Sequence, residues 1–192
     1  MIYLSDQTPL GTGQHRHCYA HPGHSRRCIK VIYNSDDSGL KEIKREISYY
    51  AHLAHYLKDW SGIPRYYGTL QTDLGIGYVY DLINDYDGKP SVTLQKILAR
   101  ELTVRDVEML RDALKKLRLY LKENHIITMT LKPQNILCKQ INGSEMLLIV
   151  CDNIGESTFI PLARWSSWLC HRKQERLWER FIQHYLLMLH SG

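Results

Sequence analysis

The chain has 192 residues, of which 44% are hydrophobic and 23% are charged, and its formal net charge is +5. This composition is typical of a soluble globular protein, and the length fits one domain or two small lobes that share a cleft. No apolar run of about 18 residues and no signal peptide is visible, which excludes a membrane-spanning helix and predicts a cytoplasmic location.

The first third of the chain is predicted to form strands separated by turns. A strand at residues 8–10 leads into the glycine-rich residues 11–13, and a second strand covers 16–20. A third strand is expected over 28–33, where β-branched and aromatic side chains are frequent. The predicted order is therefore strand, glycine turn, strand, turn, strand.

A helix is predicted next, over residues 40–57. Its apolar residues recur at the spacing of one helical face: Ile43, Ile47, Tyr50, Ala54 and Leu57. Two further strands are expected at 66–70 and 77–83, followed by the turn-rich segment 84–90. We interpret 84–90 as a hinge between two lobes.

The second half of the chain is predicted to be mainly helical. A capping-box pattern at Thr103 marks the start of a helix that runs to Leu121. The segments 135–139 and 146–151 are expected to form a hairpin, and 164–190 a further helix. The long helix is expected to form the core of the second lobe.

Residues 128–137 resemble a protein-kinase catalytic loop that lacks its catalytic base. In the kinase pattern H-R-D-L-x-x-x-N, the Asp takes the proton of the substrate hydroxyl and the Asn holds a Mg²⁺ ion. Leu131, Lys132 and Asn135 keep their places, whereas Thr130 stands in the position of the Asp and Thr128 in that of the His. We predict Lys132 and Thr130 as catalytic-loop positions and Asn135 as a metal ligand.

The N-terminal strands supply candidates for phosphate binding. Gly11 and Gly13 lie between two predicted strands, where a glycine hairpin lets backbone N–H groups approach phosphates, and Arg16 stands where a third glycine is expected. Lys30 lies on the third predicted strand, as the phosphate-binding Lys of kinases does. These residues predict a nucleotide site for ATP.

Two acidic residues complete the kinase-like order. Glu46 lies near the middle of the predicted helix, where it is expected to pair with Lys30. Asp152 ends a hydrophobic strand and begins Asp152-Asn153-Ile154-Gly155, in the position of the Mg²⁺-binding D-F-G motif. Singly, a strand Lys is commonly a surface residue, a helix Glu is commonly solvated, and a strand-ending Asp is commonly a turn residue. Their joint order favours the kinase-like interpretation.

The predicted fold class is α+β, a small bilobal protein-kinase-like fold in a single domain. Residues 1–83 form an N-lobe of antiparallel sheet plus helix, 84–90 the hinge, and 91–192 a reduced, mainly helical C-lobe.

Five segments of the chain also resemble the enterobacterial YrbL family of PhoP-regulon proteins. They are residues 1–5, 10–13, 58–66, 131–138 and 151–157, so the resemblance extends over essentially the whole chain. It implies a cytoplasmic protein with a protein-kinase-like fold, made when the PhoP/PhoQ system senses low Mg²⁺ or related envelope stress. It implies no particular substrate.

Two departures from the kinase pattern weaken the enzyme interpretation. The hydroxyl of Thr130 is no base near pH 7, and loss of general-base catalysis typically costs about 10²–10⁴-fold in rate. After Asp152 only residues 153–192 follow and no A-P-E motif is present, so the substrate-binding part of a kinase lobe is expected to be truncated.

The favoured function is therefore a pseudokinase that binds Mg-ATP and acts through a protein partner. The first alternative is a slow or atypical kinase that phosphorylates a protein or a small molecule, because phosphoryl transfer depends mostly on positioning and electrostatics. The second is a binding module that uses basic helices and no nucleotide, although nucleic acid and a membrane surface are disfavoured as partners.

Two other features invite different interpretations. A zinc site would draw on the histidine-rich segment 15–24, with His15, His17, Cys18, His21 and His24. Neighbouring residues of a strand point to opposite sides, so loop histidines on a hairpin are the simpler account. The five cysteines are scattered without a C-x-x-C pair and are expected to be free thiols: Cys18, Cys28, Cys138, Cys151 and Cys170.

Overall fold

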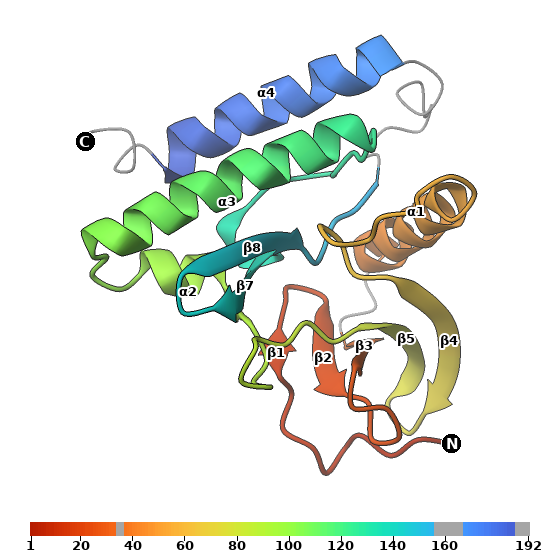
Figure 1. Cartoon of the computed structure of the whole chain (residues 1–192). Coiled ribbons are helices and arrows are strands. Elements are labelled where there is room, and N and C mark those ends of the chain that lie inside the picture. Colours follow the sequence, from red (N-terminus) through yellow and green to blue (C-terminus); the bar gives the residue numbers. More distant parts are fainter. Residues whose placement is uncertain (34–36, 156–166, 187–192) are drawn as a thin grey trace.

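The computed structural model describes residues 1–33, 37–155 and 167–186. It has a mixed α+β architecture (Figure 1), with a five-stranded sheet toward one end, helices α3 and α4 side by side at the other, and a short hairpin between them. No helix in the described ranges is both long and apolar enough to cross a bilayer.

The five-stranded sheet is antiparallel throughout and has the strand order β1-β2-β3-β5-β4. Its strands are β1 (Gly11–Thr12), β2 (Arg16–Ala20), β3 (Arg27–Ile32), β4 (Tyr66–Thr72) and β5 (Gly75–Asp81). The central strand β3 is buried on both faces, because Ile29 and Val31 pack with Leu4 and Tyr19 while Cys28 joins the main core. The predicted N-terminal antiparallel sheet is confirmed.

The first helix, α1 (Asp37–Leu53), connects β3 to β4. Its predicted apolar face is confirmed in part, since Ile43, Tyr50 and Leu57 are buried whereas Ile47 is half-buried and Ala54 is exposed. The helix ends at Leu53 instead of residue 57, because the chain turns there and the main-chain N–H groups of 55–57 bond back to 52–53. The prediction of its end was wrong by one turn.

The second part of the chain combines helices with a three-stranded sheet in the order β6-β7-β8. Its elements are β6 (Val92–Thr93), α2 (Leu94–Leu98), α3 (Val104–Glu123), a 3₁₀ turn (Pro133–Asn135), β7 (Ile136–Asn142), β8 (Glu145–Val150) and α4 (Ser167–Tyr185). The capping box at Thr103 and the β7–β8 hairpin are confirmed, whereas β6 and α2 were not expected. Of the helix predicted over 164–190, residues 164–166 and 187–190 lie outside the described part.

The predicted hinge, residues 84–90, is a turn anchored to β7. The carboxylate of Asp85 accepts hydrogen bonds from the Ser91 hydroxyl at 2.5 Å and from the Gln140 main-chain N–H at 2.9 Å. The main-chain N–H of Tyr86 bonds to the carbonyl of Gln140 at 3.0 Å. Two of these hydrogen bonds join the turn to Gln140 of β7.

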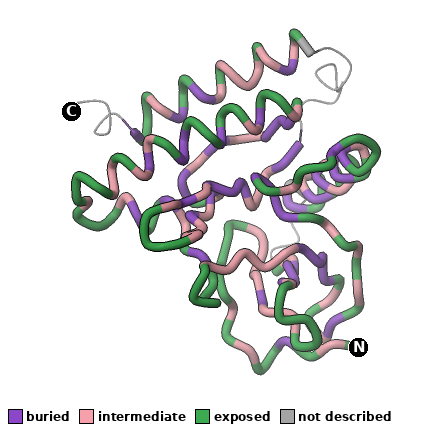
Figure 2. Tube along the Cα trace, in the orientation of Figure 1, coloured by how far each residue is buried: buried purple, intermediate pink, exposed green. Residues whose placement is uncertain are grey.

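One hydrophobic core spans the sheet and the helices. Buried positions follow the inner sides of α1, α3 and the hairpin (Figure 2). A single cluster joins Tyr80 of the first sheet and Ile43 of α1 to Leu110 of α3 and Val150 of β8. Burial of this shared apolar surface fixes the sheet relative to the helices.

Tyr49 of α1 ties the helix to the loop that follows α3. Its side chain is 1% exposed, and its hydroxyl accepts from the main-chain N–H of Ile127 at 2.9 Å and donates to the carbonyl of His125 at 3.2 Å. The Tyr49→Phe variant is expected to lose about 1–3 kcal/mol of unfolding free energy, because the buried N–H of Ile127 loses this partner.

Urea denaturation measures this loss, and Tyr56→Phe is the matched control. The Tyr56 hydroxyl bonds to the carbonyl of Asn124 at 3.4 Å from an exposed position, so its removal is expected to change stability by less than about 0.5 kcal/mol. Equal losses in the two variants would contradict the anchoring role of Tyr49.

Candidate functional site

Lys30 extends from the first sheet to the segment that follows β8. It lies on β3, as predicted, and is 8% exposed. Its Nζ donates a 2.6 Å hydrogen bond to the carbonyl of Cys151 and lies 3.9 Å from a carboxylate oxygen of Asp152. The ammonium also lies 4.8 Å from the centre of the Tyr80 ring. Two predicted site residues, Lys30 and Asp152, therefore meet although they are distant in sequence.

Arg16 joins the two carboxylates of this site. It begins β2, and its guanidinium donates to both carboxylate oxygens of Glu46, at 3.3 and 3.0 Å. The same group forms a short ion pair with Asp152. Because the side chains of Arg16 and Glu46 are only 11% and 1% exposed, water and salt screen their attraction weakly. We refer to Arg16, Glu46 and Asp152 as the Arg16 bridge.

The expected ion pair between Lys30 and Glu46 is corrected by this arrangement. In the described part of the chain Glu46 pairs with Arg16, and it also accepts a 2.7 Å hydrogen bond from the Tyr80 hydroxyl. A planar guanidinium matches both oxygens of a carboxylate, whereas an ammonium acts as a point charge. Arg16 therefore holds the carboxylate, and Lys30 bonds to the carbonyl of Cys151 instead.

The electrostatics of the site follow from its burial. Burial alone would lower the pKa of Arg16, but the adjacent Glu46 carboxylate outweighs it and raises the pKa above the ordinary value. Burial, followed by the negative charge of Glu46, raises the pKa of Tyr80 well above its usual range. Arg16 therefore stays charged and the Tyr80 hydroxyl stays protonated, as their hydrogen bonds to Glu46 require.

The predicted catalytic-loop segment lies against the residues around Asp152. The main-chain N–H of Met129 bonds to the carbonyl of Asn153 at 2.7 Å, and Thr128 pairs with Ile154 in an isolated bridge. Asn153 adopts a left-handed conformation, with φ of 58°, and its side-chain N–H donates to the Thr130 hydroxyl at 3.0 Å. Thr130 is thus fixed next to the residue that follows Asp152.

Asn135 and Lys132 lie in the same loop. The main-chain N–H of Cys151 donates to the carbonyl of Asn135 at 2.9 Å. This hydrogen bond places Asn135 beside the residue that precedes Asp152 in the chain. Lys132 precedes the 3₁₀ turn, and its half-buried side chain forms no ion pair with the residues that the structure describes. The assignment of Asn135 as a metal ligand and of Lys132 as a catalytic residue stays a prediction.

The two glycines of the first hairpin lie differently from the prediction. Gly11 belongs to β1 and pairs with Cys18, so the turn covers residues 13–15 instead of 11–13. Neither Gly11 nor Gly13 has a positive φ, and a Cβ at Gly11 would meet nothing within 4 Å. The internal structure therefore does not require glycine at residue 11.

Sequence reasoning did not assign Arg16 or Tyr80 to the site. The available signal for Arg16 was its position, where a glycine-rich phosphate loop carries its third glycine. A long charged side chain at that position reaches into the site. The sequence carried no comparable signal for Tyr80, whose role depends on the pairing of β3 with β5.

A comparison with models of protein families shows to which family this chain belongs. The model of the family described as PhoP regulatory network protein YrbL matches residues 2–186. The chain belongs to this family.

Two relatives of the family, both named Uncharacterized protein YrbL, come from Escherichia coli (strain K12) and Shigella flexneri. Each is 62% identical to the chain over 182 residues, which are 95% of this chain and 87% of the relative. The predicted resemblance to the YrbL family is confirmed.

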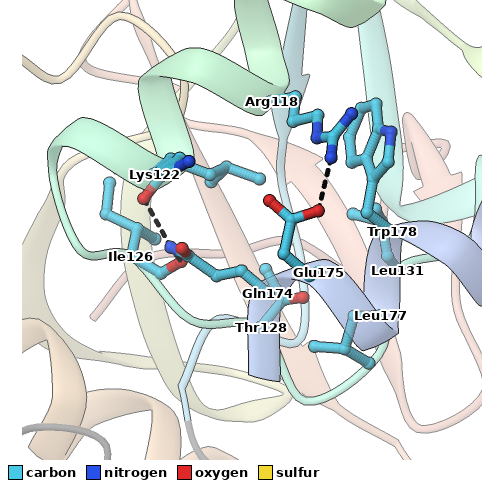
Figure 3. Close-up of a pocket in the computed structure, with 10 residues that line it drawn as sticks. Arg118, Lys122, Ile126, Thr128, Leu131, Gln174, Glu175, Leu177 and Trp178 are labelled. Atoms are coloured by element: carbon cyan, nitrogen blue, oxygen red, sulfur yellow. Dashed lines mark hydrogen bonds and ion pairs between the residues drawn. The ribbon is translucent and has the colours of Figure 1, made fainter. Parts of the chain in front are cut away.

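A small cavity of this YrbL family member lies between α3 and α4 (Figure 3). Gln174 of α4 crosses it and donates to the carbonyls of Leu121 and Ile126, at 2.6 and 2.8 Å. Arg118 and Glu175 form an ion pair at its rim. These contacts attach α4 to the end of α3. The cavity is therefore a gap in the packing between the two helices.

A second cavity of the YrbL family member, of about 290 Å³, lies between α1 and β4. Its lining combines the aromatic residues Tyr50, Trp60, Tyr66 and Tyr67 with aliphatic residues of and after α1 and with Arg65. Neither cavity is lined by Lys30 or by a member of the Arg16 bridge. The side chain of Arg16 itself fills the space between Glu46 and Asp152.

Two observations concern the other interpretations of the sequence. No group of three or more His, Cys, Asp or Glu residues within the described ranges is arranged to hold a metal ion. Two cations of the basic helices are paired with acids, Lys116 with Asp112 and Glu145 and Arg118 with Glu175. The basic surface of α3 and α4 is therefore partly neutralised.

Proposed function

We propose that this YrbL family member is a kinase-like protein that binds Mg-ATP and acts as a pseudokinase through a protein partner. The observation that carries the proposal is the convergence of Lys30 and Asp152, which lie 3.9 Å apart at the junction of the first sheet with the β7–β8 hairpin. In kinases the same two residue types, from the same positions in the chain order, bind the phosphates and Mg²⁺.

The chemistry of the donor groups fits the ligand. Asp152 and Asn135 offer oxygen atoms, which Mg²⁺ prefers, and Lys30 offers a positive charge for phosphate. The space around Gly11 leaves its backbone open to a phosphate, since a Cβ there meets nothing within 4 Å. Bound Mg²⁺ would supply charge neutralisation of the phosphates.

The Arg16 bridge bears on metal binding, because Arg16 is paired with the proposed Mg²⁺ ligand Asp152. Arg16 neutralises the charge of Asp152, so a Mg²⁺ ion held by Asp152 would take over this role from the guanidinium. Arg16 then keeps its two hydrogen bonds to Glu46. We therefore expect Mg²⁺ to compete with the Arg16 guanidinium for the Asp152 carboxylate.

The absence of a base at residue 130 supports a pseudokinase over a fast kinase. The Thr130 hydroxyl accepts a hydrogen bond from Asn153 and has no proton-accepting role near pH 7. Binding without efficient transfer suits a protein whose nucleotide stabilises one conformation for a partner.

A thermal-shift measurement with Mg-ATP tests this function. Wild-type protein is expected to gain about 2.7 kcal/mol of unfolding free energy at a hundredfold excess of ligand over Kd. Lys30→Met and Asp152→Asn are expected to lose the shift, because each removes a charge that faces the phosphates or Mg²⁺.

The matched controls are the same substitutions at exposed positions, Lys96→Met on α2 and Asp112→Asn on α3. Both controls are expected to keep the wild-type shift. A wild-type protein that is folded and gains no stability at millimolar Mg-ATP would overturn the proposal.

A further inference from the structure

The cavity between α1 and β4 is accessible from solvent. Ala51 and Ala54, which line it on the side of α1, are exposed, and Tyr67 of β4 is 43% exposed. Its volume of about 290 Å³ is close to the lower limit of small-molecule sites, which usually measure about 300–1,000 Å³. A cavity of roughly half this volume holds benzene. The space is therefore large enough for a ligand with one or two rings.

The inner part of the lining belongs to the hydrophobic core. Tyr50 and Leu57 line the cavity, are 3% and 6% exposed, and are members of the main core cluster. The ring of Tyr50 also contacts the ring of Tyr80 edge to face, with 5.7 Å between their centres. Because the core holds these side chains in place, a ligand meets a preformed surface and binding orders few side chains.

Aromatic rings supply a flat surface for such a ligand. The rings of Tyr50 and Trp60 are parallel within 5°, with their centres 6.2 Å apart, and the centre of the Tyr66 ring lies 5.8 Å from that of Tyr50. Aromatic rings pack well against other rings, either offset and parallel or edge to face. The cavity therefore fits an aromatic or other flat apolar body.

Arg65 gives the cavity a positive charge. Its guanidinium lies 5.7 Å from the centre of the Trp60 ring and forms no ion pair with the residues that the structure describes. The carboxylate of Asp81 accepts from the Arg65 main-chain N–H and from the Tyr67 hydroxyl, each at 2.8 Å. No acidic residue of the described part lines the cavity, and Arg27 brings a second cation to within 4.0 Å of the centre of the Tyr67 ring. The Arg65 guanidinium is therefore available to an anionic group.

We propose that this cavity binds a small aromatic carboxylate, whose flat apolar body packs on Tyr50, Trp60 and Tyr66 and whose carboxylate pairs with Arg65. A guanidinium matches both oxygens of a carboxylate, and the rings match an aromatic body, so this class of ligand uses both parts of the lining. The lining includes neither Lys30 nor a member of the Arg16 bridge. The proposal therefore stands independently of Mg-ATP binding.

The first test titrates folded, isotope-labelled wild-type protein with cinnamate and with cinnamamide and follows the main-chain amide signals by NMR. The two probes have the same shape, and only cinnamate carries a negative charge. Both are expected to shift the signals of Ala51, Ala54 and Tyr67 saturably at millimolar concentration. Since a partly exposed charge pair contributes modestly, cinnamate is expected to bind about two- to fivefold more tightly.

The second test changes the lining at its exposed positions, where substitution disturbs the core least. Ala51→Trp and Ala54→Trp each place a large side chain at the cavity, and filling it is expected to weaken both probes at least about tenfold. Arg65→Gln removes the charge, so its affinity for cinnamate is expected to fall to that for cinnamamide.

The matched controls carry the same substitutions at exposed positions outside the lining, Ala99→Trp after α2 and Arg176→Gln on α4. Both are expected to bind the probes as wild type does, and the NMR spectrum of each variant reports whether it is folded. Absence of saturable shifts at the lining residues of wild type would overturn the proposal. So would unchanged binding in both tryptophan variants, or a preference for cinnamate that persists in Arg65→Gln.

Discussion

The Arg16→Met variant is expected to lose about 3–5 kcal/mol of unfolding free energy, because it leaves the carboxylate of Glu46 buried without its cation. Glu46 is 1% exposed, and among the residues that the structure describes the Tyr80 hydroxyl is the group that remains to bond to it. Denaturation by urea with two spectroscopic probes measures the loss. The Arg16→Lys variant keeps the positive charge but loses the planar guanidinium that bonds to both oxygens of Glu46. Its unfolding free energy is expected to lie between those of wild type and Arg16→Met.

The matched control is Arg118→Met, which removes an arginine from an exposed ion pair with Glu175. Exposed pairs contribute about 0–1 kcal/mol, so this variant is expected to stay close to wild type. The double variant Arg16→Met/Glu46→Leu removes both buried charges and is expected to recover part of the lost stability. Equal losses for Arg16→Met and Arg118→Met would contradict the burial of the Arg16 bridge.

The Thr130→Asp variant is expected to raise ATP-dependent phosphoryl transfer from a low wild-type level, by up to about 10²–10⁴-fold. An aspartate at residue 130 keeps an oxygen acceptor for the Asn153 side chain and adds the base that the kinase loop carries. Autophosphorylation and ATP turnover with radiolabelled ATP measure the change.

The matched control for the base is Thr130→Asn, which has the shape of aspartate without its proton affinity. The rate of phosphoryl transfer by Thr130→Asn is expected to stay at the wild-type level. Robust phosphorylation by wild type that Asp152→Ala abolishes would contradict the pseudokinase assignment and favour the slow-kinase alternative.

The regular elements were predictable because they have strong local signals. β3 follows from its β-branched residues and α3 from a capped apolar stripe, and the positions of β2, β3 and α3 are confirmed within a few residues. The short elements β6 (Val92–Thr93) and α2 (Leu94–Leu98) were missed, since two to five residues carry too little periodicity to be recognised.

The sequence predicts that Lys30 and Asp152 lie in one site, but it does not predict which side chains form the ion pairs there. Lys30 reaches Asp152 as the kinase-like order implies. The partner of Glu46 depends on which cation of the sheet points inward, and Arg16 lies 30 residues from Glu46 and 136 from Asp152 in the chain. Such a choice depends on strand pairing and side-chain geometry, which no local pattern encodes.

The central claim, that Lys30 and Asp152 form a Mg-ATP site, is tested most directly by isothermal titration calorimetry of the wild-type protein with ATP. The account predicts saturable one-site binding that requires Mg²⁺ and is lost in a folded Asp152→Asn variant. Wild-type protein that shows no saturable binding at millimolar ATP with Mg²⁺, or that binds as tightly after Asp152→Asn, would contradict it.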